Sequence, residues 1–447
     1  MATTIFWFRQ DLRLHDQVAL KFALDQLVQT VEQDRRSPDL GHHLLPVFCL
    51  PDFLQTSSWG FSRMSSLRRY WLLSALRDLS DQLAKLGCPL LICPIDASSA
   101  LPQLAQHVGA RKIVCEEIAA PEELAEISAL RNAGLQVHTV WQSSLLSSDD
   151  LPWDKQCLPQ VFTQFRQIIE GEGISPPPPL PAPSSLPSWP TTIIPAHLQL
   201  DFSQLPWQEP TPDPRSSFPL GEGEFSGGEA AALEHLRQYL RARLPHTYKQ
   251  TRNGLMGKDF SSKWSPWLAN GALSARNAYA ELKRFELEHG ANDGSYWLWF
   301  ELLWRDYFRF LHLQYGAKLY RAQGLNSTSS EAHSSHNQTK FDAWCQGATG
   351  ESLIDAAMHE LHTTGYLSNR LRQVVASYLI YELDGNWRAG AAWFETCLID
   401  YDVYSNQGNW LYIAGRGTDP RGGRRFSVAK QVRDHDRDGH YQRTWST

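Results

Sequence analysis

A run of serines in the second half of the chain has the composition of an anion site. Residues 261–266 read Ser-Ser-Lys-Trp-Ser-Pro. A serine before a proline is typical of a helix start, where the Ser265 hydroxyl would cap free amides and Pro266 fits the first turn. Ser261 and Ser262 would add hydroxyls near the positive end of the helix dipole, an arrangement that favours a diphosphate. A capping sequence without a ligand is the simpler alternative.

A second group combines a carboxylate with an aromatic ring. Glu301, Trp304 and Arg305 are spaced three and four residues apart, so they share one face of a predicted helix. An exposed Glu–Arg ion pair is the simpler interpretation. A carboxylate beside Trp in a cavity would instead have a raised pKa and hydrogen-bond a ligand.

A third group places amide and guanidinium groups together. Asn369, Arg372 and Gln373 follow Gly365 and fall on one helical face. Such side chains can hold a polar ring or a buried carboxylate.

A fourth group contains two acids in apolar surroundings. Asp400 and Asp402 need partners if they are buried. Arg372 could neutralise one of them, and Asp400 is the plausible partner. Asp402 and Asn406 would then be free to contact a polar heterocycle.

The first 150 residues have the pattern of a doubly wound α/β domain with a parallel sheet. Apolar runs at 4–8, 43–49, 89–93, 112–115 and 136–140 predict strands, and 71–86 and 121–133 predict helices between them. Residues 9–13 after the first strand contain no Gly-rich turn, which disfavours a nicotinamide dehydrogenase.

The rest of the chain divides into a linker and an all-α domain. Residues 151–228 form the predicted linker, and 176–190 contain eight prolines, which favours an extended connector over a surface. Residues 229–447 form the predicted all-α domain. Its helices are expected at 229–240, 267–288, 296–315, 352–363, 369–383 and 389–400.

Composition restricts the function further. The formal net charge of −6 is unlike that of a general nucleic-acid binder, yet residues 411–447 carry eight Arg or Lys against four Asp. This local basic segment permits a phosphate-backbone partner, or it is a merely solvated tail. The seven cysteines lack metal-ligand spacing, so no metal site and no disulfide framework are predicted. No signal peptide or membrane span is predicted, which favours a cytoplasmic monomer, although import of a longer precursor into an organelle stays open.

Together these segments resemble the photolyase/cryptochrome family over nearly the whole chain. The opening run 6–16, Phe-Trp-Phe-Arg-Gln-Asp-Leu-Arg-Leu-His-Asp, is similar to that family's N-terminal signature. Runs 247–254, 406–412 and 417–421 resemble the DASH cryptochromes in particular. The resemblance implies a blue-light flavoprotein with FAD in the helical domain.

The resemblance also implies roles for single residues. Asn406 would face flavin N5, and Glu301 and Arg305 would lie beside the cofactor. The implied FAD-binding residues are Tyr248, Ser261, Ser262, Trp264, Ser265, Glu301, Arg305, Asn369, Arg372, Asp400, Asp402 and Asn406.

By the same resemblance the enzyme would repair cyclobutane pyrimidine dimers, mainly in single-stranded DNA, by electron transfer from photoexcited reduced FAD. Glu301, Trp304 and Asn406 would be catalytic. Flipping out a damaged base costs least in a single strand. The implied DNA contacts are Trp304, Arg370, Gln373, Tyr412, Arg424 and Arg425, with Lys430 as a further phosphate contact.

Photoreduction in this family uses a chain of tryptophans, to which Trp410 and Trp387 correspond. The third member falls at Ser334, so Trp344 or Tyr320 is a candidate exit for the electron. A methenyltetrahydrofolate antenna is implied in the first domain, with Glu117 as its ligand, although the surrounding residues depart from the family pattern.

A blue-light receptor that signals by flavin redox change, with little or no repair, is the alternative. A long C-terminal extension would favour it, and this chain stops soon after Trp445.

Overall fold

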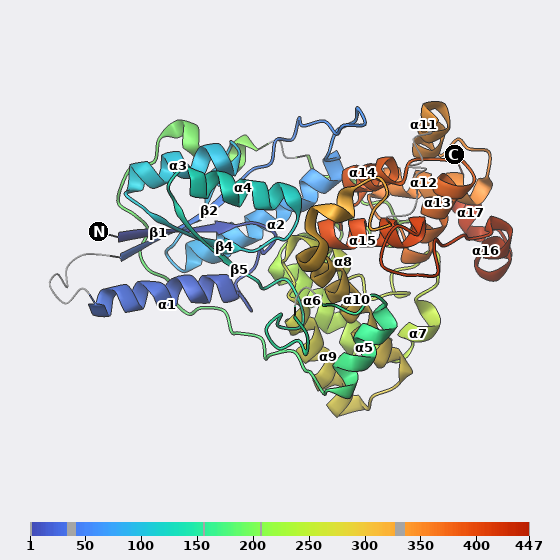
Figure 1. The fold of residues 1–447 in the computed structure, drawn as a ribbon, viewed down its shortest axis with the longest axis horizontal. Helices are drawn as coiled ribbons and strands as arrows, with labels where there is room; N and C mark the ends of the chain where they lie inside the picture. Colours follow the sequence, from blue (N-terminus) through green and yellow to red (C-terminus); the bar gives the residue numbers. More distant parts are fainter. Residues whose placement is uncertain (1, 34–41, 155–156, 206–207, 327–335, 447) are drawn as a thin grey trace.

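The molecule has an α/β half and a helical half (Figure 1). The structure is a computed structural model, and it describes residues 2–446 except 34–41, 155–156, 206–207 and 327–335. In Figure 1 the sheet lies on the left and the helices of the second half lie on the right.

The α/β half contains one parallel sheet of five strands in the order β3-β2-β1-β4-β5. The strands are β1 (Ala2–Phe8), β2 (His42–Cys49), β3 (Leu91–Cys93), β4 (Lys112–Glu116) and β5 (Gln136–Val140). All five predicted strands are confirmed, with β3 two residues shorter. β1 is central, and its residues Ile5, Phe6 and Phe8 are completely buried.

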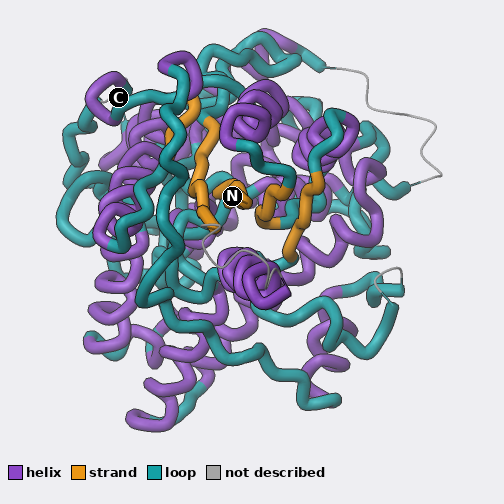
Figure 2. The backbone as a smooth tube through the Cα atoms, turned by 90° about the vertical axis from the view of Figure 1, so that its left-hand side faces the viewer, coloured by secondary structure: helices purple, strands orange, loops and turns teal. Residues whose placement is uncertain are grey.

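Helices cover both faces of this sheet, which confirms the doubly wound prediction (Figure 2). One face packs against α1 (Val18–Gln33) and α2 (Ser66–Lys85). The other packs against α3 (Ala97–Val108) and α4 (Pro121–Asn132). Alternate residues of β1 pack into the two cores, because successive side chains of a strand point to opposite faces of the sheet.

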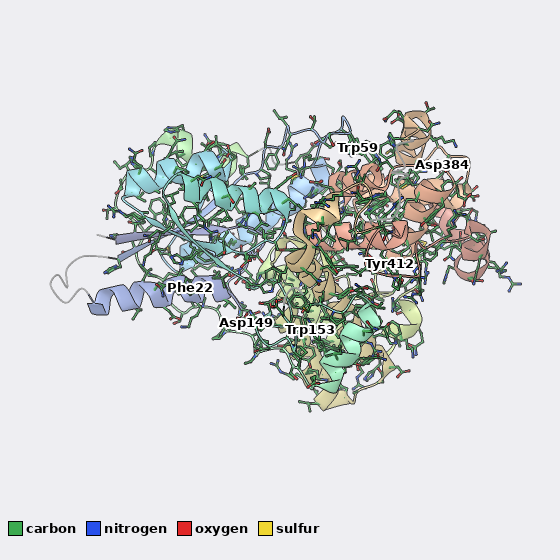
Figure 3. All side chains as sticks on the ribbon, viewed as in Figure 1. Phe22, Trp59, Asp149, Trp153, Asp384 and Tyr412 are labelled. Atoms are coloured by element: carbon green, nitrogen blue, oxygen red, sulfur yellow. The ribbon has the colours of Figure 1, made fainter. Side chains whose placement is uncertain are left out.

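The chain then crosses to the helical half and returns. Asp149 and Trp153 lie on the crossing segment (Figure 3), and α5 (Phe162–Gly171) packs against α10 (Asp293–Tyr315). The proline-rich stretch is extended, as expected, and runs back along the α/β half. The Leu44 amide donates to the Ser188 carbonyl there at 3.2 Å.

The second half is helical, as predicted. Besides α5 and α10 its α-helices are α6 (Glu229–Arg241), α7 (Tyr248–Thr251), α8 (Ser265–Asn270), α9 (Ala275–His289), α11 (Gln338–Gln346), α12 (Ser352–Thr364), α13 (Asn369–Tyr381), α14 (Trp387–Cys397), α15 (Val403–Ala414), α16 (Val428–His435) and α17 (His440–Trp445).

The single helix expected over 267–288 is wrong, because the chain breaks into α8 and α9. Gly271 has a left-handed φ of 76°, and a Cβ there would lie 2.0 Å from the Gln10 carbonyl oxygen. Ser274 then caps α9 by accepting from the amides of Arg276 and Asn277. Gly271 thus ends α8, Ser274 starts α9, and the absence of a side chain at Gly271 lets the first half of the chain pack against the break.

The signature segment after β1 forms this junction between the halves. The Arg13 guanidinium donates to the Gly271 carbonyl at 2.9 Å, and Asp16 forms an ion pair with Arg276 at 2.8 Å. Glu229 at the start of α6 accepts from the amides of Leu14 and His15. The polar residues that follow β1 thus hold the two halves together.

Candidate flavin site and neighbouring clefts

The four predicted segments converge on one cavity of about 410 Å³ in the helical half. α7, α8, α10 and α13 contribute its walls, together with the turn between α14 and α15. Eleven of the twelve predicted cofactor residues line it, and they are Tyr248, Ser261, Ser262, Trp264, Ser265, Glu301, Arg305, Asn369, Arg372, Asp400 and Asp402. Residues far apart in the chain are thereby brought together.

The serine end of the cavity differs in detail from the predicted cap. Trp264 rather than Ser265 is the cap residue of α8, and no side-chain hydrogen bond caps this helix. Ser265 is instead the first helical residue and is exposed, with Pro266 next to it in the first turn. The expected capping role of the Ser265 hydroxyl is therefore wrong, while the helix start is confirmed.

Lys263 is a cation at this end that the sequence did not single out. It is 4% exposed, and its ammonium lies 5.1 Å from the centre of the Tyr366 ring. Burial lowers its pKa to about 8. Its place inside the serine run was the available signal, since a lysine between serines at a helix start suits a phosphate.

One predicted ion pair is present. The Arg372 guanidinium donates to Oδ2 of Asp400 at 2.8 Å, and Arg372 also donates to the Leu367 carbonyl. Oδ1 of Asp400 is buried and has no partner among the described residues. This free oxygen leaves Asp400 able to accept a hydrogen bond from a ligand.

Asp402 is not free, contrary to the prediction. Its Oδ2 accepts from the buried Arg309, and its Oδ1 accepts from the Ser405 amide at 2.8 Å, which caps α15. Burial alone would raise the pKa of Asp402, but the charges of Arg309 and Arg305 outweigh it and lower the pKa. Arg309 lies two helical turns beyond Glu301, and that spacing was the signal for it.

Glu301 and Arg305 share a helical face but do not pair. Glu301 forms an ion pair with Arg252 at 2.8 Å. Arg305 reaches two backbone carbonyls instead, Ser143 at 2.6 Å and Leu268 at 3.0 Å. Burial raises the pKa of Glu301, although Arg252 opposes this shift. Glu301 is thus held at the cavity wall by Arg252 and not by Arg305.

Asn406 is the predicted cofactor residue that lies outside the lining of the main cavity. It faces a smaller cavity of about 80 Å³, which Asn369, Arg372 and Asp400 also line. The Asn406 amide donates to the Ala391 carbonyl of α14 at 3.0 Å. Asn406 therefore adjoins the flavin site while its NH₂ group is held by the protein.

Trp410 of α15 lines this smaller cavity, whereas Trp387 of α14 lines the cleft between the two halves. Both are buried, and Trp387 donates to the Ala322 carbonyl at 3.0 Å. A Cβ on Gly390 would lie 2.2 Å from the Trp410 ring, so the ring packs directly on the α14 backbone. This contact brings Trp410 against the helix that carries Trp387.

The third position of the expected electron route lies outside the described residues, because it falls at Ser334. Trp344 packs edge-on against Trp410 with ring centres 6.4 Å apart, but it is completely buried and does not itself reach solvent. Tyr320 is partly exposed and lines the cleft between the two halves.

Trp304, Gln373 and Tyr412 line the main cavity as well. Trp304 stacks on Phe162 of α5, with ring centres 3.8 Å apart and 16° between planes, and meets Tyr412 edge-on at 5.9 Å. Tyr412 belongs to α15 and lies in the helical half (Figure 3). Phe162 was assigned to the linker, so its contact with Trp304 was missed.

Three arginines predicted to contact DNA are held by neighbours in the described structure. Arg370 donates to the Asn253 side chain at 2.7 Å. Arg424 pairs with Asp419 at 2.7 Å and lies over the Tyr412 ring, and Arg425 lies over Tyr381. Arg424 is therefore next to an aromatic residue of the cavity.

A larger cleft of about 1180 Å³ separates the two halves. The carboxyl ends of β1 and β2 form one wall, and α14 and α15 form the other. Glu117, the predicted antenna ligand, is partly exposed and is not among the residues that line this cleft. Glu122, Glu123 and Glu126 of α4 line it instead.

Known proteins resemble this chain over almost its full length. A model of the DNA photolyase family matches residues 4–184, and a model of the FAD-binding domain of DNA photolyase matches residues 297–447. Cryptochrome DASH of Synechocystis sp. is 40% identical over 99% of this chain and 87% of its own length. Chloroplastic/mitochondrial cryptochrome DASH of Arabidopsis thaliana is 39% identical over 99% of this chain and 75% of its own length.

The solved structures agree. A Synechocystis sp. cryptochrome superposes with a TM-score of 0.88 at 39% identity, covering 100% of this chain and 88% of that one. The fold and the site thus define a flavoprotein of the light-dependent photolyase class. The chain belongs to the photolyase/cryptochrome family, among the DASH cryptochromes.

The residues present fit FAD. Asp400 Oδ1 and the indole nitrogen of Trp264 are buried polar atoms of the cavity lining without partners among the described residues. Such atoms favour a polar ligand that satisfies them. Lys263 and Ser261–Ser262 would hold the phosphates, and Asn369, Arg372 and Asp400 would hold the ring system.

Among the described residues, no helix is long and apolar enough to cross a membrane.

Proposed function

We propose that the protein repairs cyclobutane pyrimidine dimers, preferentially in single-stranded DNA, under blue light. The observation that carries the proposal is a shared cavity. Trp304, Gln373 and Tyr412 line the same space as the Arg372–Asp400 pair. A flipped-out pyrimidine dimer in this space would lie directly beside the flavin.

Reduced FAD, when bound and excited by light, supplies the electron that opens the cyclobutane ring and recovers it afterwards. The protein's part is to bind, orient and shield. Asp402 is fixed by Arg309, and Asp400 is fixed by Arg372, so the cofactor side of the cavity carries balanced charges.

Glu301 is proposed to hydrogen-bond the damaged base. Burial raises its pKa, so its carboxyl can carry a proton and donate it to a base carbonyl that gains negative charge. The Arg252 guanidinium lies 2.8 Å from the Glu301 carboxylate and keeps it oriented. The same pairing gives Arg252 the role of a positioning residue.

The preference for single strands follows from the side chains at the cavity. Gln373 is polar and Tyr412 carries a hydroxyl group. Side chains of this kind would separate the strands of a duplex less effectively than bulky apolar side chains would. Unstacking costs a few kcal/mol in a duplex and least in a strand that is already single. Arg370, Arg424 and Arg425 would contact the phosphates.

Trp410 and Trp387 are proposed to return electrons to the flavin. Trp410 lines the Asn406 cavity and packs on Gly390 of α14, the helix that begins with Trp387. Indole is the most readily oxidised side chain in this part of the protein, and burial keeps both rings away from bulk solvent.

A methenyltetrahydrofolate antenna is proposed for the interdomain cleft. The cleft has room for it at about 1180 Å³, and it adjoins Trp387 and Asn406. Arg9 and Arg63 line the cleft, but each is paired with a glutamate, Arg9 with Glu126 at 2.6 Å and Arg63 with Glu395 at 2.7 Å, so a carboxylate tail would compete with these pairs. Glu117, one residue after β4, does not line this cleft, so an antenna bound there would be held by other residues.

The decisive experiment illuminates the reduced, FAD-loaded protein with oligonucleotides that contain one dimer. Dimer loss should be faster in the single strand than in the duplex. Glu301→Ala should lower the repair yield while FAD stays bound, and Glu288→Ala on exposed α9 is the matched control. No repair of either substrate by the reduced protein would overturn the proposal and leave the photoreceptor alternative.

A further inference from the structure

Two cysteines end neighbouring strands of the sheet, side by side. Cys49 is the last residue of β2 and Cys93 is the last residue of β3, and the two are register partners in the parallel pair. Neighbouring strands lie about 4.8 Å apart. Disulfide-bonded cysteines have Cα atoms about 4.4–6.8 Å apart, so this register places the pair within range.

Their side chains point to the same face. Both pack against the core formed under α3 and α4, with Val47 and Leu91 one pleat earlier. The Cys93 thiol lies within hydrogen-bonding reach of Cys49; this contact and burial raise the pKa of Cys49. The other strand cysteine, Cys115 of β4, is in register with Trp7 and Thr139 and so has no such neighbour.

Access differs between the two sulfurs. Cys49 is partly exposed and lines the interdomain cleft, whereas Cys93 is completely buried behind it. A small oxidant in the cleft would reach Cys49 first and find Cys93 as the adjacent thiol. A partly exposed cysteine with a second one beside it can close a disulfide once its thiolate has been oxidised, and the raised pKa of Cys49 means that this reaction is faster at alkaline pH.

We propose that Cys49 and Cys93 form a reversible dithiol–disulfide pair in the wall of the interdomain cleft. With hydrogen peroxide, the Cys49 sulfur attacks one peroxide oxygen, the O–O bond breaks, and a sulfenic acid and water form. The Cys93 sulfur then attacks the sulfenyl sulfur, the S–O bond breaks, and a second water leaves. Two thiols and one peroxide thus give one disulfide and two waters.

The disulfide would fasten two loops of the cleft to each other. Residues 50–65 follow Cys49 and residues 94–96 follow Cys93, and Leu50, Asp52 and Asp96 from these loops line the cleft. Oxidation would therefore stiffen one wall of the cleft without touching the flavin cavity. This inference does not depend on the proposed repair activity.

The test uses the full FAD-loaded chain in the dark. The protein is treated with hydrogen peroxide, free thiols are alkylated, and a non-reducing digest is analysed by mass spectrometry. The expected product is a pair of peptides joined between Cys49 and Cys93, lighter by two hydrogens than the separate peptides. Dithiothreitol should return both to thiols.

Two variants sharpen the result. Cys49→Ser should abolish the joined peptide, and Cys157→Ser, which removes an exposed cysteine outside the sheet, should leave it unchanged. Cys93→Ala can unfold the core, so the wild-type digest is decisive by itself. Recovery of Cys49 as a sulfinic acid or as an alkylated thiol, under peroxide that oxidises Cys157, would overturn the proposal.

Discussion

The flavin cavity and the interdomain cleft are built differently. Three ion pairs at the cavity, Arg372–Asp400, Arg309–Asp402 and Arg252–Glu301, each join residues of the helical half. At the cleft, Arg63 pairs with Glu395 of α14 at 2.7 Å, and these residues come from opposite halves. The cavity is therefore shaped by the fold of one half, and the cleft by how the halves dock.

This difference predicts which substitutions act on one region alone. A substitution inside the helical half should release FAD from the cavity, whereas a substitution at the junction should widen the cleft between the two halves.

The largest effect is expected from Asp402→Asn. It leaves Arg309, which is 2% exposed, with an uncompensated charge at the cavity wall. Loss of one partner of a buried pair costs about 3–5 kcal/mol. Urea unfolding should measure this loss of stability, and the variant should also release FAD. Glu281→Gln, in the more exposed pair with Arg284, also replaces a carboxylate with an amide. It should leave the stability and the bound FAD unchanged.

The second effect breaks the junction. Gly271→Ala places a Cβ 2.0 Å from the Gln10 carbonyl oxygen at a left-handed φ. The combined clash and backbone strain should cost about 3 kcal/mol or more. Gly87→Ala has a similar φ of 72° and open space, so it should cost only about 1 kcal/mol. Equal losses in the two variants, measured by urea unfolding, would contradict a tight junction at Gly271.

The third effect is a pH dependence. Burial raises the pKa of Glu360 on α12 to about 8, and Tyr441 donates to it at 2.6 Å. At a pH between the ordinary pKa of glutamate and about 8, Glu360 keeps in the folded protein a proton that it has lost in the unfolded chain. The free energy of unfolding therefore falls as pH rises through this window.

Glu360→Gln removes that titration and keeps an acceptor for Tyr441. The variant should be more stable than the wild type by about 5 kcal/mol at pH 9, since each pKa unit of the shift corresponds to about 1.4 kcal/mol, and the two should be close at pH 5. Burial also raises the pKa of Glu116, at the end of β4, to about 8. Glu116→Gln should therefore show the same sign from the α/β half. A variant that loses stability at high pH would contradict the assignment.

The smallest effect concerns the aromatic wall. Phe162 covers one face of Trp304, so Phe162→Leu should loosen that ring. Aromatic stacking contributes about 0.5–1.5 kcal/mol, which corresponds to binding of single-stranded DNA weakened by several-fold. Fluorescence titration with an oligothymidine measures it, and FAD content should not change. Phe22→Leu, in the α/β half, is the control.

Local patterns predicted the parts that depend on neighbours in sequence. The apolar runs gave all five strands, because a strand buried on both faces needs continuous apolar residues. The one-face spacing of Asn369, Arg372 and Gln373 predicted a cavity wall, and Arg372 pairs with Asp400 as expected. Helical periodicity alone was enough to place α10, α12 and α13 to within a few residues.

Contacts between distant segments could not be read in this way. Arg305 reaches Ser143 rather than Glu301, and Asp402 pairs with Arg309, because each buried charge takes the partner that the packed helices bring near it. The close approach of the Gln10 carbonyl oxygen to Gly271 likewise joins segments that are far apart in the sequence.

The sequence by itself thus determined the two-part architecture, the family and the four segments that meet at the cavity. Only the tertiary structure decided which charges neutralise each other, which face of Trp304 Phe162 covers, and that Cys49 and Cys93 are neighbours. The physical reason is the separation along the sequence over which each effect acts. Periodicity and capping act within one element, whereas charge pairing and packing depend on residues that meet only after folding.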